Sequence, residues 1–228
     1  MYFNLAVTMM IVGFALFLAY IAVLIYSNSL IGSVDRNHFR NSFPYNFYMS
    51  ASIPLRASMY ILLCLSTLAT AVGESLFFLS FDTTFMVVAA ILMPLSLILL
   101  TIANILPLSS YRLHLIFSGA GFFVFAASAS VIPFSIVIPY ALAFTNDLSL
   151  GIAIPLGIMG ILSLLSLINP KLANWFKMEK TERDGTTYYV KPKYNFYAMY
   201  EWIFLIESHI AAFLFILNII VTNAIELA

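Results

Sequence analysis

Ionisable side chains inside long apolar stretches are the residues of this chain that could carry chemistry. Glu74 lies in the apolar stretch 57–80, and Glu207 lies in the stretch 199–222. A charged group at the centre of a bilayer costs at least about 2.5–3.5 kcal/mol, so such residues are typical of proton relays and ion pathways. Each of the two carboxyl groups is therefore a candidate proton carrier.

Helical spacing places each carboxyl group in a polar stripe. At about 100° per residue, Asn218 lies within about 60° of Glu207, and Thr70 lies about one turn before Glu74. Counted from the basic end of each helix, Glu74 lies about 25 Å deep and Glu207 about 12 Å deep, so the two carboxyl groups are not expected to touch. We predict an intramembrane polar site formed by Glu207, Asn218, Glu74 and Thr70. The structural alternative is that these residues form hydrogen bonds between helices.

The histidines and serines do not form a recognisable catalytic or metal-binding pattern. His114 and His209 could ligate a haem iron only at similar depth, and their predicted depths differ by roughly 15 Å. His209 lies about 200° from Glu207 on the helix, and Ser208 points about 100° away from His209. We expect Glu201, at the inner boundary of its helix, to be solvated. The sequence therefore predicts no catalytic residue, no cofactor and no metal site, and it favours a protein that is not an enzyme.

Four basic side chains are suited to contact phosphate. Arg36, His38 and Arg40 lie in the polar loop 27–56, and Arg112 lies between two later apolar stretches. Arginine binds phosphate through a planar fork of donors, so we predict that these residues contact lipid headgroups. An enzyme acting on lipid headgroups would use the same side chains, although arginines on the cytoplasmic side are expected from membrane topology alone.

The composition indicates which elements position these residues. The chain of 228 residues is 63% hydrophobic and 9% charged, whereas about 25% of a soluble domain is charged. A membrane-spanning helix needs about 20 predominantly apolar residues. The sequence therefore predicts an all-α bundle of six transmembrane helices in a single domain, over residues 3–26, 57–80, 85–107, 114–136, 150–168 and 199–222.

The basic residues predict the orientation of these helices. All 10 Lys and Arg residues fall after the first, third and fifth predicted helices. Lys and Arg collect in cytoplasmic loops, so we predict a multi-pass protein of the cell membrane with both termini outside and loops 27–56 and 169–198 inside. Acidic residues also number 10, and a net charge of zero does not favour a nucleic-acid partner.

Both long loops carry local structural signals. In loop 169–198, Asp184-Gly185 stands between two β-prone stretches and predicts a small β-hairpin. Loop 27–56 mixes aromatic residues with arginines, which is typical of a segment lying on the headgroup layer.

The fourth and fifth predicted helices carry two further signals. Pro133 favours a helix end at that point, followed by an interfacial loop over 137–148, rather than one kinked helix. Small residues such as Gly160 let helices approach closely in lipid. They predict a tight seam between helices 114–136 and 150–168, or a contact between two copies of the chain through these helices.

Most of the polar chemistry of the chain lies in its loops, and this distribution guides the functional prediction. We predict an integral membrane protein without a catalytic motif that acts in assembly, sensing or scaffolding. Its expected partners are membrane lipid and a protein bound at the cytoplasmic loops. The alternative is a small secondary transporter or proton-coupled permease that uses Glu207 and Glu74.

Overall fold

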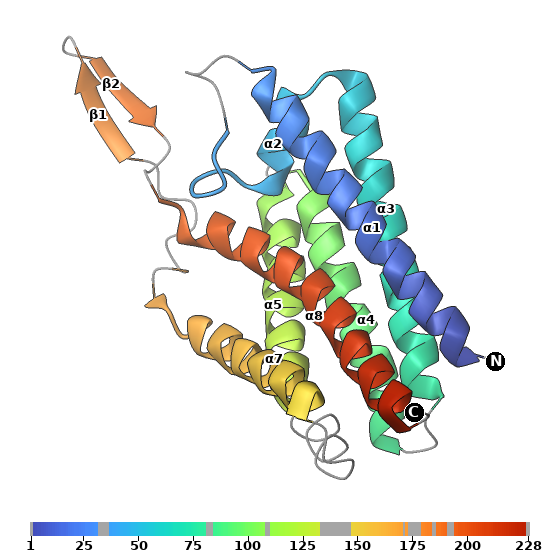
Figure 1. Ribbon diagram of the computed structural model, residues 1–228. Helices are drawn as coiled ribbons and strands as arrows, with labels where there is room; N and C mark the ends of the chain where they lie inside the picture. The colour runs from blue at the N-terminus through green and yellow to red at the C-terminus, as the bar shows by residue number, and fades with distance from the viewer. Residues whose placement is uncertain are drawn as a thin grey trace.

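The computed structural model consists of helices and one small β-hairpin (Figure 1). It describes residues 2–31, 37–80, 84–107, 110–132, 147–170, 172, 179–183, 186–190 and 194–226. The helices are α1 (Tyr2–Ser29), α2 (Pro44–Ser50), α3 (Ile53–Leu79), α4 (Thr84–Ile105), α5 (Tyr111–Ile132), α7 (Asp147–Ser166) and α8 (Phe196–Glu226). The strands are β1 (Glu179–Arg183) and β2 (Thr186–Val190).

Four helices are long and apolar enough to cross a membrane. Their apolar segments are Phe3–Ser29, Ile53–Leu79, Val87–Ile105 and Arg112–Ser130. These segments coincide with the first four predicted spans, and they mark the chain as a membrane protein. The helices α7 and α8 occupy the positions of the other two predicted spans, and the described apolar part of α7 is the shorter segment Gly157–Ser166.

The helix ends follow local signals. The helix α3 begins at Ile53 rather than at residue 57, because Pro54 suits the first turn of a helix, where its missing N–H costs nothing. The helix α5 is described up to Ile132, and Pro133, where the sequence predicts the helix end, lies outside the described residues. The predicted interfacial loop 137–148 lies outside the described residues up to residue 146, and α7 begins at Asp147.

Residues 37–51 form a strap that packs onto the helices, and this strap belongs to the loop predicted to lie on the headgroup layer. The strap contains α2, whose Phe47 and Tyr48 are fully buried. The Tyr20 and Tyr48 hydroxyls are hydrogen-bonded at 2.7 Å, and burial raises the pKa of Tyr48 well above its usual range, so its hydroxyl stays protonated. Phe43, Phe47 and Tyr48 of this loop are therefore buried against protein, whereas Phe39 is exposed.

The Arg56 guanidinium closes the end of the strap. It donates hydrogen bonds to the carbonyl oxygens of Tyr48, Met49 and Ala51 at distances of 2.9–3.2 Å. These carbonyls lie at the C-terminal end of α2, where a helix lacks internal donors and favours a cation. Arg56 thus fixes the junction between α2 and α3.

The predicted hairpin is present as an antiparallel pair of strands. Glu179 pairs with Val190 at its open end, and Arg183 pairs with Thr186 next to the turn. The turn residues Asp184 and Gly185 lie outside the described residues. Figure 1 shows the hairpin standing apart from the helices, at the end of the bundle that also carries α2, while both ends of the chain lie at the opposite end.

The helices α1 and α3 form a close seam that the sequence did not predict. A Cβ atom at Gly13 would overlap Thr70 Oγ1 and lie 2.8 Å from the Thr70 backbone nitrogen. The Ser66 hydroxyl lies 2.9 Å from the Gly13 carbonyl oxygen in the same seam. The predicted seam between α5 and α7 is also present, since a Cβ atom at Gly160 would overlap the Ala129 backbone. Such close approach provides packing and hydrogen bonding where lipid removes the hydrophobic drive between helices.

Two glycine substitutions test the importance of the α1–α3 seam. Gly13→Ala should lower the free energy of unfolding by about 1–3 kcal/mol, because the new methyl group forces the two helices apart. Gly119→Ala is the matched control on α5, where nothing lies within 4 Å of the added Cβ. It should raise the free energy of unfolding by about 0.4–1 kcal/mol through helix propensity. Thermal unfolding in lipid nanodiscs measures both, and a loss of similar size in the two variants would contradict the close seam.

Candidate functional site

Two members of the predicted intramembrane polar site lie on one buried face of α3. Glu74 and Thr70 are each 2% exposed. Neither Glu74 Oε2 nor Thr70 Oγ1 has a hydrogen-bond partner within the described part of the protein. One turn away, the hydroxyls of Thr67 and Thr101 are hydrogen-bonded at 2.6 Å and join α3 to α4. A buried carboxyl group without a partner is costly, so it is a strong candidate to hold a proton.

The other two members of that predicted site lie on α8. Glu207 is half-buried and accepts a hydrogen bond of 2.8 Å from the hydroxyl of Ser163 on α7. Asn218 belongs to α8, but its side chain lies outside the described part. Glu74 therefore faces the interior beside α1, whereas Glu207 lies at the contact between α7 and α8.

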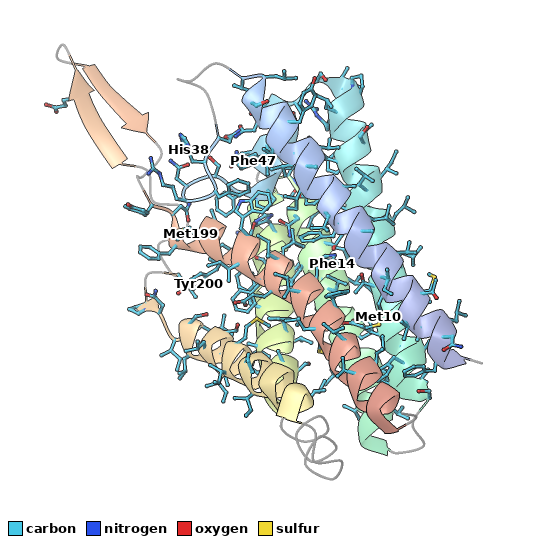
Figure 2. The ribbon with its side chains drawn as sticks, in the orientation of Figure 1. Met10, Phe14, His38, Phe47, Met199 and Tyr200 are labelled. Atoms are coloured by element: carbon cyan, nitrogen blue, oxygen red, sulfur yellow. The ribbon has the colours of Figure 1, made fainter. Side chains whose placement is uncertain are left out.

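The predicted headgroup contacts lie at the end of the bundle that carries the hairpin. His38 is exposed there, on the outside of the helices (Figure 2). The exposed Arg40 guanidinium lies 5.9 Å from the centroid of the Tyr194 ring, and its backbone carbonyl accepts a hydrogen bond from Asn195. Arg112 is exposed at the start of α5, and Arg36 lies outside the described residues. Contact of these residues with lipid headgroups stays a prediction.

A buried His–Glu pair is the most concentrated polar feature in the described interior, and the sequence analysis missed it. His114 Nε2 on α5 lies 2.6 Å from Glu201 Oε1 on α8, and both side chains are fully buried. The expectation that Glu201 is solvated is therefore wrong. The strap covers this end of the bundle, so a residue near the predicted membrane boundary is enclosed by protein. One signal could have indicated the pair, because His114 and Glu201 each lie near the basic end of a helix and so at similar depth.

Several elements surround this pair. The Ser118 and Tyr197 hydroxyls are hydrogen-bonded to each other beside it. The backbone carbonyls of Ala103 and Leu106, at the C-terminal end of α4, act on the imidazole ring. His114 Nδ1 is buried without a hydrogen-bond partner in the described structure. Glu201 Oε2 itself is buried without a hydrogen-bond partner in the described structure.

The strap covers the pair directly. The edge of the Phe43 ring meets the His114 ring with centroids 5.6 Å apart, and Phe43 is 5% exposed. Phe43 also contacts the ring of Tyr197. The indole N–H of Trp202 donates a hydrogen bond of 2.9 Å to the Ser42 carbonyl and holds the strap on α8. The pair is thus sealed between α5, α8 and the strap.

A second buried histidine joins α8 to the α1–α3 seam. His209 Nδ1 lies 2.9 Å from the Leu205 carbonyl, and this distance requires a proton on Nδ1. Nε2 lies 3.0 Å from the oxygen of the Ser66 hydroxyl, which also lies 2.9 Å from the Gly13 carbonyl oxygen, so the single hydroxyl proton is within reach of both acceptors. The ring also stacks on Phe17, with centroids 3.8 Å apart. Serine and histidine can form a nucleophile and its base, but here both residues are enclosed, and the contact joins α3 to α8.

The haem and metal hypotheses gain no support. His114 and His209 each bind a different partner on a different helix, as described above. Within the described residues, no group of three or more His, Cys, Asp or Glu side chains lies close enough to hold a metal ion.

Comparison with known proteins does not indicate a function. No protein-family model, curated protein or solved structure matches the chain.

A double-mutant cycle tests the strength of the His–Glu pair. His114→Leu should lower the free energy of unfolding by about 3–5 kcal/mol, because it leaves a buried carboxyl group without its partner. The double variant His114→Leu/Glu201→Leu should recover most of this loss, since two apolar side chains need no partner. Thermal unfolding of the two single variants and the double variant provides the cycle. Additive losses would show that the two residues do not interact.

Proposed function

We propose that the protein is a six-helix component of the cell membrane that acts in sensing or assembly, with the strap and the hairpin as its interaction surface. The observation that carries this proposal is the hairpin, which stands apart from the helices in Figure 1. A two-stranded hairpin alone is at best marginally stable in water, and both of its edges offer unpaired backbone groups to another chain. Its position at the end of a membrane bundle suits contact with a protein partner.

The distribution of basic residues supports a cytoplasmic location for this surface. Arg40, Arg56 and Arg183 belong to the strap, the adjoining start of α3 and the hairpin. Both ends of the chain lie at the opposite end of the bundle in Figure 1. Loops rich in Lys and Arg stay on the cytoplasmic side, so both termini would lie outside the cell.

The polar contacts between helices support a role without catalysis. The Ser66–His209, Thr67–Thr101 and Ser163–Glu207 contacts each join two helices. Such contacts are the ordinary means of holding helices together in lipid. The exposed apolar face of α7, which includes Ile158 and Leu162, would contact lipid or a second copy of the chain.

Replacing the hairpin tests this function. Residues 179–190 would be exchanged for a short Gly/Ser linker, which keeps Asn195 and Tyr197 in place to hold the strap. Membranes of the native host would be treated with a cross-linker, and partners of the wild type and the variant would be compared by mass spectrometry. We expect at least one protein partner to be lost with the hairpin.

Two controls sharpen this experiment. The variant should keep the thermal stability of the wild type, which shows that the bundle is intact. Arg40→Gln, a change in the strap, should weaken capture of the same partner if the strap and hairpin form one surface. An unchanged set of partners in the hairpin variant would overturn the proposal.

A second candidate function is a proton-coupled permease, and one observation favours it. Glu74 Oε2 and Thr70 Oγ1 are buried side by side on α3 without partners in the described structure. A permease would use such groups to carry a proton, with Glu207 at a second level and Asn218 beside it.

Proton flux in proteoliposomes tests this alternative. Glu74→Gln should abolish flux after a pH jump, because the amide cannot take up and release a proton. Glu207→Gln tests whether the carboxyl group at the second depth also carries the proton. Gly119→Ala serves as a structurally mild control. Flux that is equal in the wild type and Glu74→Gln would exclude a pathway through Glu74.

A further inference from the structure

We propose that His114 and Glu201 form a proton-binding site, and that the strap of residues 37–51 controls its exchange with water. The two groups are fully buried, 2.6 Å apart, and come from different helices. Glu201 Oε2 is buried and has no hydrogen-bond partner in the described structure, so this oxygen can accept a hydrogen bond from a further donor. The ligand of this site is the proton itself.

Burial fixes the number of protons that the closed site holds. With one proton shared between imidazole and carboxylate, the pair has no net charge. Loss of that proton would leave a buried carboxylate alone, and gain of a second would leave a buried imidazolium alone. Either state leaves an unpaired charge away from water, which is unfavourable, so the closed site should keep one proton over a wide range of pH.

Several groups face the pair. On α8, the Tyr197 hydroxyl is hydrogen-bonded to Ser118 of α5. The helix α4 contributes the carbonyls of Ala103 and Leu106, and the strap contributes the ring of Phe43. The cover of the pair is thus an aromatic ring, which excludes water.

Opening of the strap breaks hydrogen bonds near the pair as well as the packing of Phe43. Backbone N–H of Asn195 binds the Arg40 carbonyl at 2.8 Å, and the Trp202 indole binds the Ser42 carbonyl at 2.9 Å. If the strap lifts, water reaches the imidazolium, which in water loses its proton near neutral pH. Proton release and strap opening are therefore coupled, so that each event favours the other.

The site also lies in the path between the strap and the hairpin. Glu201 belongs to the first turns of α8, and the hairpin directly precedes this helix in the chain. A change in the pair would shift the start of α8 against α5, together with the segment that leads to the hairpin. This role as the input to a sensor rests on the proposed function, whereas proton binding at the pair does not.

Infrared spectroscopy of the full chain in lipid nanodiscs tests the site. The difference between wild type and Glu201→Gln isolates the absorption of the Glu201 carboxyl group. In the wild type this absorption should stay constant between about pH 5 and 8. In Phe43→Ala water reaches the pair, and the imidazole bands of His114, isolated by the difference from His114→Leu, should then titrate within that range, whereas in the wild type they should stay constant.

Deuterium exchange measures the access of water to the pair in the wild type as well as in the variants. After transfer to deuterated buffer, the Glu201 absorption of the wild type should shift slowly, and that of Phe43→Ala at least about tenfold faster. Phe17→Ala is the matched control, because it removes the ring that stacks on the other buried histidine, His209. It should leave the exchange of Glu201 at the wild-type rate.

Three results would overturn the proposal. One is a wild-type Glu201 absorption that titrates freely or exchanges within the mixing time. The second is equal exchange in wild type and Phe43→Ala, and the third is equal acceleration in Phe17→Ala. If Phe43→Ala does not fold, the wild-type exchange rate alone decides. The proton site and the proposed partner surface fail separately, because replacement of residues 179–190 leaves Glu201 and Phe43 in place.

Discussion

The hydrocarbon core of a membrane offers no hydrogen-bond partner, and this constraint governs the interior of the protein. Each polar side chain carried into the bundle must be bonded by another helix or kept neutral. The hydroxyl of Ser66 therefore lies against His209, and the carboxyl group of Glu201 lies against His114. Close approach of α1 and α3 at Gly13 follows the same logic, since packing replaces the hydrophobic drive.

Most elements of the fold could be predicted from the sequence. Apolar runs of about 20 residues predicted the spanning helices because the thickness of lipid sets their length. Asp184-Gly185 predicted the hairpin, because this signal depends on local backbone geometry alone. The α1–α3 seam escaped prediction, since an isolated Gly13 does not reveal which helix it faces.

The candidate site was harder to predict from the sequence, because it depends on contacts between distant segments. Glu201 lies at a predicted membrane boundary, where solvation is the ordinary expectation. It is buried because the strap folds back over the bundle, and that packing depends on aromatic contacts such as Phe43 against His114. Helical periodicity correctly separated Glu207 from His209, since angles within one helix need no tertiary information.

The bond between Trp202 and the strap gives the protein a built-in optical reporter. The Trp202 indole is 2% exposed, donates to the Ser42 carbonyl, and meets the rings of Phe39 and Phe47 edge-on. Indole fluorescence responds to hydration, so departure of the strap would change the colour of its emission. Trp175, the other tryptophan, lies outside the described residues, and its replacement by phenylalanine would leave one native fluorophore next to Glu201. The motion of this segment can then be followed in an intact membrane without any attached dye.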